Sequence, residues 1–274
     1  MEPRAVRRWT AARGLAVARV GAVVAAVVAT AALATPASAA RPVRDPARPR
    51  AASPRADTST GEPLLGEAVR EYTTMTATRY QHHDVEDAEA GTYYYDCVGF
   101  VTYAMSQATP IADATIRDEY HIAPDRVPAP GVFVHLFATL DGSQAGWEPV
   151  GQVADLRPGD VVAWSYDSAS SSNEPGHDRT SRGHAFVVAS APQPSGTDSY
   201  LVQVWDSTGT PHGPNDTRRT NPKNLPDTGG KPSGLGTGTV RIEAGADGAI
   251  ATVRWSPSSG PVPAAHFGMG RPVS

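Results

Sequence analysis

The spacing of apolar residues changes once along this chain, near Gly146, and this change limits the fold more than any other feature of the sequence. Before Gly146, apolar side chains recur every three or four residues, which is the spacing of one helix face. After it, they alternate or form short runs, which predicts strands. Helices followed by strands predict an α+β fold, in which N-terminal helices pack on an antiparallel five-stranded sheet.

Three helices and five strands are expected from this pattern. The first helix carries the apolar stripe Leu65, Ala68, Val69, Tyr72 and Met75, the second begins at Cys97 with Asp96 as its N-cap, and the third spans 130–140. The strands cover 161–164, 185–189, 201–205, 240–242 and 250–255. Two long loops, 165–183 and 207–236, interrupt them, and such loops in compact domains are usually functional or mobile.

The N-terminal segment has the three parts of a secretory signal. Residues 1–19 are arginine-rich, residues 20–34 are apolar, and Ala37-Ser38-Ala39 forms a small-residue cleavage site. We expect a signal peptide over 1–39, a disordered spacer rich in Pro, Arg and Ala over 40–61, and one domain over 62–274. The protein is therefore expected to be secreted, with wall association and either the general or the twin-arginine export route left open.

Charge argues against some classes of partner. The whole chain has 24 basic and 28 acidic residues, and the leader holds five arginines and one glutamate, so the mature chain has net charge −8. Nucleic-acid binding depends largely on neutralising phosphates, so this balance disfavours it. No apolar stretch after the leader is long enough for a bilayer, and we expect a monomer without membrane contact after cleavage.

Cys97 is the strongest candidate for a chemically reactive residue. It is the only cysteine, so no intramolecular disulfide can form and the fold must depend on its core. A buried free cysteine is often an inert small hydrophobe. Here, however, the sulfur is expected at a helix N-terminus, where unpaired N–H groups and the helix dipole favour the nucleophilic thiolate.

His184 is the candidate base, because it stands at the start of an apolar strand. If the strands on either side of residue 195 pair antiparallel, then Ala189 faces Leu201 and His184 faces Asp206. Directly opposed residues have Cβ atoms about 4.5–5.5 Å apart, which would let Asp206 orient the imidazole. The sequence therefore predicts a catalytic set of Cys97, His184 and Asp206, with His212 as the next candidate for the third position.

Three motifs in this order resemble the NlpC-type cell-wall peptidases, a papain-like family. Asp96-Cys97-Val98-Gly99-Phe100-Val101 is similar to that family's Asp-Cys-Ser-Gly-Phe-Val nucleophile motif. The segments Leu156-Arg157-Pro158-Gly159-Asp160-Val161 and Gly183-His184-Ala185-Phe186-Val187 resemble its Pro-Gly-Asp strand and its Gly-His strand. The likeness covers roughly residues 62–210.

The resemblance implies a papain-like fold with Cys97 as nucleophile and His184 as base. It also implies amide hydrolysis in peptidoglycan stem peptides, without a metal or an organic cofactor. This chain departs from the family in Val98, where Ser is usual, and in Asp206, where the family commonly has His. The family often has a tyrosine upstream of the nucleophile, and spacing leaves Tyr80 and Tyr93 as equal candidates.

Other functions remain open at this level. A wall-binding module that has lost the chemistry would keep the same fold, and an acyltransferase or thioesterase would keep the same thiol. A zinc site could be sought in His82, His83 and Asp84 with His177 and Asp178 or with His212. No ligand spacing typical of zinc supports it, and a solvated polar loop is the favoured interpretation.

Overall fold

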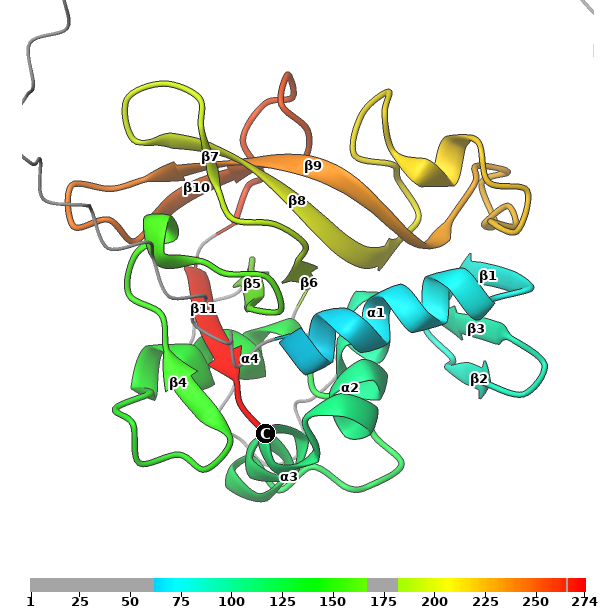
Figure 1. Ribbon diagram of the computed structural model, residues 1–274, viewed down its shortest axis with the longest axis horizontal. Coiled ribbons are helices and arrows are strands. Elements are labelled where there is room, and N and C mark those ends of the chain that lie inside the picture. Colours follow the sequence, from blue (N-terminus) through cyan, green and yellow to red (C-terminus); the bar gives the residue numbers. More distant parts are fainter. Residues whose placement is uncertain (1–61, 167–181, 265) are drawn as a thin grey trace, which may run out of the picture. The chain divides into compact units, whose positions relative to one another are not determined.

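The described part of the chain has four α-helices, and three of them follow the sequence pattern (Figure 1). The computed structural model describes residues 62–166, 182–264 and 266–274. The expected signal peptide, the spacer and most of the 165–183 loop, with His177 and Asp178, lie outside these residues. The helices are α1 (Glu62–Thr74), α2 (Cys97–Ala108), α3 (Pro110–Glu119) and α4 (Pro130–Thr139).

Helix boundaries agree with the local sequence, but one expected face is wrong. Helix α2 begins at Cys97 as predicted, because the Asp96 carboxylate caps it. Helix α1 buries Leu64, Ala68 and Glu71, whereas Val69, expected in the stripe, is 40% exposed. Helix α3 was not expected, since it buries only Ala112, Asp113 and Ile116 and so has a weak apolar stripe.

The main sheet has eight antiparallel strands, so the expectation of five is wrong. The strands follow the order β10-β9-β8-β6-β5-β11-β4, and β7 pairs with β8. Their bounds are β4 (Trp147–Pro149), β5 (Val161–Ser165), β6 (Gly183–Val188), β7 (Gln193–Pro194), β8 (Ser199–Thr208), β9 (Gly234–Ala244), β10 (Ile250–Arg254) and β11 (His266–Pro272). Strand β11 was not predicted, because it has Gly268 and Gly270 at positions where an apolar side chain would mark a strand. Phe137 packs closely against both glycines.

A second sheet of three short strands lies next to helix α2. It has the order β1-β3-β2, with β1 (Ala77–Tyr80) parallel to β3 (Thr92–Tyr95) and β2 (Val85–Asp87) antiparallel to it. The sequence pattern did not predict these strands, since each has only three or four residues. Strand β3 ends at Tyr95, so this sheet delivers the chain to the N-terminus of α2.

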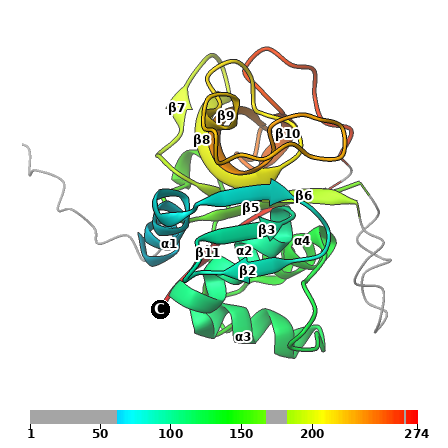
Figure 2. The same ribbon diagram turned by 90° about the vertical axis from the view of Figure 1, so that its right-hand side faces the viewer.

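Strands β5 and β6 separate two apolar cores. Val161, Ala163, Ala185 and Val187 pack with the helices, whereas Val162, Trp164, Phe186 and Val188 pack with side chains of β8, β9 and β10. Figure 2 shows β8 to β10 curving over β5 and β6. Burial on both faces explains why these two strands have continuous apolar runs instead of alternation.

The register between β6 and β8 differs by two residues from the expected one. Val187 pairs with Trp205 and Val188 with Val204, so Ala189 does not face Leu201 and His184 does not directly face Asp206. The short strand β7 pairs with Tyr200 and Leu201 instead, so the first residues of β8 pair with β7 and not with β6. A shift of two residues keeps each side chain on its face of the sheet, so His184 and Asp206 remain neighbours.

Candidate active site

Cys97 is the first residue of α2 and is almost completely buried, with 4% exposure. The Asp96 side chain fixes the helix start, because its Oδ1 accepts the N–H groups of Val98 at 3.1 Å and Gly99 at 2.9 Å. The backbone of Ala185 on β6 hydrogen-bonds the Cys97 thiol. Ala185 packs in the same apolar core as Cys97, whereas the ring of the preceding residue, His184, contacts Trp164 and Trp255 on the other face of β6. The structure thus brings His184 and Asp206 together, and pairing of His184 with Cys97 stays a prediction.

The ionisation state of the thiol differs from the expectation. Burial, together with the negative charge of Asp96, raises the pKa of Cys97 well above its ordinary value. The backbone hydrogen bonds from Ala185 and Val98 act in the opposite direction but do not offset burial. The resting side chain is thus a neutral thiol, and the expected thiolate at the helix N-terminus is wrong.

His184 is the second residue of β6 and is also buried. Its Nε2 lies 2.6 Å from Oδ2 of Asp206, and a carboxylate only accepts, so Nε2 carries the proton. Burial lowers the pKa of His184, although Asp206 acts against it. The imidazole is therefore neutral, with its lone pair on Nδ1, and can act as a base through that atom.

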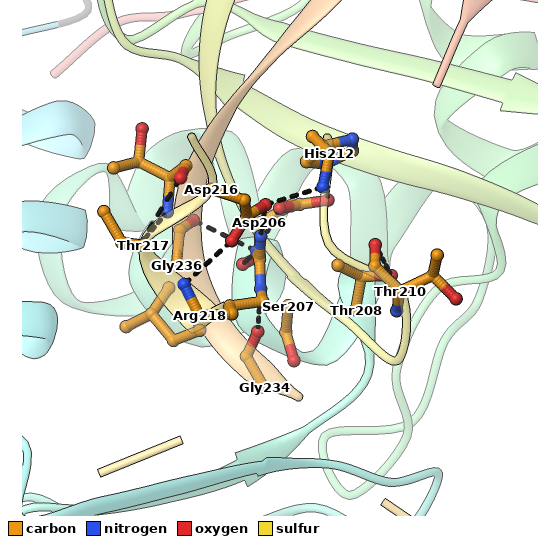
Figure 3. A network of polar contacts seen from close by, with 12 residues as sticks. Asp206, Ser207, Thr208, Thr210, His212, Asp216, Thr217, Arg218, Gly234 and Gly236 are labelled. Atoms are coloured by element: carbon orange, nitrogen blue, oxygen red, sulfur yellow. Dashed lines mark hydrogen bonds and ion pairs between the residues drawn. The ribbon is translucent and has the colours of Figure 1, made fainter. Parts of the chain in front are cut away.

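Asp206 on β8 is completely buried and makes more contacts than an orienting carboxylate needs (Figure 3). Its Oδ2 accepts from His184 and also from Nε2 of His212 at 2.8 Å, and its Oδ1 accepts from the Arg218 guanidinium. Burial alone would raise the pKa of Asp206, but Arg218, His212 and His184 hold it well below the usual range. Asp206 is therefore ionised.

Two further residues of this site were missed at the sequence level, and they come from the loop between β8 and β9, which spans 209–233 and is shorter than the expected 207–236. Arg218, on the short helix η3 (Thr217–Arg219), bonds Asp206 and also Asp216 at 2.7 Å. Both side chains are fully buried. A signal was present in Gly234-Leu235-Gly236-Thr237-Gly238, since glycine at every second position of a strand leaves room for close packing on one face.

His184, Asp206 and His212 form the only group among the described residues whose ligand atoms, all within 4.8 Å of one another, could hold a metal ion. The two N···O distances of 2.6 and 2.8 Å are hydrogen-bond lengths. Zinc ligands at about 2.0–2.1 Å from the ion would stand about 3.3 Å apart in a tetrahedral site. Arg218 would also repel a cation from Asp206. The arrangement is that of a hydrogen-bonded cluster.

A pocket of about 740 Å³ opens at Cys97. Its polar lining includes Tyr80, His82, Asp84, Asp96, Asp125 and Arg182. Burial and the nearby carboxylates of Asp96 and Glu86 raise the pKa of Asp84 to about 7. The pocket is thus acidic near the thiol and is large enough for several residues of a peptide.

The structure separates the two candidate tyrosines. Tyr80 lines the pocket beside Cys97. Tyr93 is completely buried in the core, where its hydroxyl accepts from Arg70 at 3.4 Å. His82, from the alternative zinc set, instead bonds Asp96 through Nδ1 at 2.9 Å.

No family model, no curated protein and no solved structure matches this chain. Within the described ranges 62–166, 182–264 and 266–274, none of the helices has the length and apolar character needed to cross a membrane.

Proposed function

We propose that this protein is a secreted cysteine hydrolase that cleaves amide bonds in peptides, with Cys97 as nucleophile, His184 as base and Asp206 as the group that orients His184. The observation that carries the proposal is that Cys97, the first residue of α2, lines a pocket of about 740 Å³. A buried carboxylate holds His184 in the tautomer that leaves Nδ1 as an acceptor.

The reaction begins from a neutral pair. As the Cys97 sulfur attacks the amide carbonyl carbon, its proton moves to Nδ1 of His184. His184 then gives the proton to the leaving amine, and the acyl group stays on sulfur as a thioester. Water next attacks the thioester, with His184 as base, and the acid leaves as the thiol is restored.

We assign two donors to the oxyanion of the tetrahedral intermediate. The backbone N–H of Cys97 makes no hydrogen bond within the described part of the chain, and it points from the first turn of α2. The Tyr80 hydroxyl lines the same pocket. Donors held in a buried site stabilise developing charge without reorganising, which is often the largest part of catalysis.

The substrate class follows from the pocket and from the motif resemblance. Three carboxylic acids, Asp84, Asp96 and Asp125, line the pocket and favour a peptide with an ammonium group close to the cleaved bond. Peptidoglycan stem peptides carry such groups, and the motifs shared with NlpC-type peptidases point to the same substrate. We therefore also propose that the chain has a papain-like fold and is a member of the NlpC-type peptidases.

Cell-wall digestion tests the proposed function. Purified protein lacking residues 1–39 should release wall fragments with new amino termini, and Cys97→Ala should release none while keeping its thermal transition. Walls of several peptide chemistries should be used, since the pocket does not define one sequence. Equal background release by the wild type and Cys97→Ala from all walls would contradict hydrolysis.

The same dyad also supports acyl transfer to an acceptor other than water. A thioester intermediate accepts amines, so added hydroxylamine would trap the acyl group in either reaction. Products joined to an acceptor, without free new acids, would identify an acyltransferase. Wall binding without any thioester would identify a binding module.

A further inference from the structure

His212 lies in an environment that fits only a charged imidazole. Its Nε2 is 2.8 Å from Oδ2 of Asp206, and its Nδ1 is 2.8 Å from the backbone carbonyl oxygen of Trp255. Both partners are acceptors, and Asp206 is ionised. A neutral imidazole has one N–H and could satisfy only one of them, whereas an imidazolium satisfies both.

The charges around His212 give the same result. The groups that face it are Asp206 from β8, His184 from β6, and Asp216 and Arg218 from its own loop. Strand β9 contributes no titratable group there, since Gly238 lies against His212. With His184 neutral, a charged His212 makes the cluster electrically neutral, while a neutral His212 would leave one uncompensated negative charge buried.

Trp255 provides an independent observation. Its ring centroid lies 4.2 Å from that of His212, at an interplanar angle of 37°, and its Nε1 donates to Thr210 at 3.0 Å. A cation close to the face of a tryptophan ring is attracted by the ring quadrupole. The same ring lies 4.9 Å from His184, so Trp255 covers both histidines.

The space for this cluster is built into strand β9. Gly236 pairs directly with Asp206, and a Cβ at Gly236 would stand 2.6 Å from Arg218 Cγ. A Cβ at Gly238 would stand 2.7 Å from His212 Cβ. Two glycines on one face of β9 therefore leave the space in which the Arg218 and His212 side chains pack against Asp206.

We propose that His212 is a positioning residue that donates from both ring nitrogens and, with Arg218, holds Asp206 ionised and oriented toward His184 and keeps His184 neutral at rest. The inference rests on the proposed function, since it describes the base of that reaction. Because two cations already contact Asp206, this carboxylate stabilises an imidazolium at His184 less than an unpaired carboxylate would. His184 therefore takes up a proton only when Cys97 releases one.

Histidine-selective ¹⁵N NMR on the full mature chain tests the charge directly. We expect both ring nitrogens of His212 to carry protons at neutral pH, because each of them faces an acceptor. Cys97→Ala should give the same spectrum. A single N–H on His212 at neutral pH would overturn the proposal, and this measurement requires neither activity nor a variant of the cluster.

The effect on His184 is tested with His212→Gln. The amide can still donate to Asp206 but brings no charge, so the titration midpoint of His184 should rise by about one pH unit and the acid limb of turnover should move with it. His135→Gln is the matched control, because His135 lies outside the site. It is half-buried, and its Nδ1 is 2.6 Å from the Tyr120 hydroxyl oxygen. A purely structural role would lower turnover at every pH and leave the midpoint unchanged.

The outcomes separate the two proposals. If wild-type protein releases nothing from walls while His212 is doubly protonated and His184 shifts in His212→Gln, only the hydrolase function is wrong. If walls are cleaved in a Cys97-dependent way while the His184 midpoint does not move, only the role of His212 is wrong. If His212→Gln does not fold, His212→Asn and the wild-type NMR spectrum decide.

Discussion

Burial raises the pKa of Cys97 and lowers the pKa of His184, so it favours the neutral form of both side chains. Removing water from a thiolate or an imidazolium disfavours the ion more than the neutral group. For Cys97, the Asp96 carboxylate acts in the same direction as burial. The thiol and the imidazole are therefore both neutral at rest, and in the proposed reaction charge appears on them only as the sulfur attacks.

Thiol alkylation should report this neutral state. The rate with iodoacetamide should be slower than that of a free thiol at pH 7 and should still rise above about pH 8.5, where a free cysteine is already half ionised. The rate constant is measured by loss of free thiol across the pH range, with Cys97→Ala as the blank. A plateau reached below pH 7 would instead show a preformed thiolate.

Asp206→Asn should lower both turnover and stability. The amide keeps the size of the carboxylate but leaves Arg218 and His212 without their shared anion, and breaking a buried ion pair typically costs about 3–5 kcal/mol. Urea denaturation at neutral pH measures the loss. Asp118→Asn, an exposed carboxylate on α3, is the control and should stay within about 0.5 kcal/mol. Equal stability of the two variants would contradict the buried network.

At the scale of elements, strand β9 decides where the loop between β8 and β9, residues 209–233, can lie. Its Gly236 and Gly238 face the loop residues, while Val240 and Ile242 continue the same face into the core beside β10. The strand therefore has a packed half and an open half. The open half is filled by the Arg218 and His212 side chains, so this loop is part of the folded core.

Gly236→Ala should be strongly destabilising for a single added methyl group. Its Cβ would lie 2.6 Å from Arg218 Cγ, and the fully buried Arg218 cannot move aside without losing Asp206. Overpacking of this kind costs about 1–3 kcal/mol, and turnover should fall with it. Gly66→Ala in α1 is the matched control: no atom lies within 4 Å of its Cβ, so helix propensity should stabilise it by about 0.5–1 kcal/mol. Thermal and urea unfolding of both variants decide the sign.

Sequence patterns predicted the elements that carry Cys97 and His184, because a capping Asp and an apolar run act over a few residues. They did not predict the β6–β8 register, since β7 inserts a second pairing between them. The alternating glycines of β9 signalled close packing on that strand, but the sequence did not show that Arg218 would fill the space. Its partners Asp206, Gly234 and Gly236 are 12 to 18 residues away, and only the assembled sheet brings them to one place.

At the scale of the whole described structure, Tyr95 joins the elements that fix the position of Cys97. Its hydroxyl donates to Glu71 Oε2 of α1 at 2.6 Å, and its carbonyl oxygen accepts from Ser207 of β8 at 2.7 Å. The next two residues are Asp96 and Cys97. The first helix, the small sheet and the main sheet thus hold one point of the chain, immediately before the thiol.

Glu71 makes the stability of this arrangement depend on pH. The side chain is completely buried, and its Oε1 has no hydrogen-bond partner among the described residues. Burial raises the pKa of Glu71 from 4.5 to about 8, although the Tyr95 hydroxyl favours the ion. The folded protein therefore binds the Glu71 proton more tightly than the unfolded chain does, and this contribution is complete below pH 4.5 and is lost as the pH rises toward 8.

Glu71→Gln should remove that loss, because the amide resembles the protonated acid and cannot ionise. Near pH 4.5 the free energies of unfolding of wild type and variant should be close. Above pH 8 the variant should be more stable by several kcal/mol, on the order of 4, since a tenfold change in proton affinity corresponds to about 1.4 kcal/mol. Urea denaturation at a series of pH values gives both curves, with the exposed Glu62→Gln of the same helix as the control. Curves that stay parallel over this range would show that Glu71 is already ionised in the folded protein.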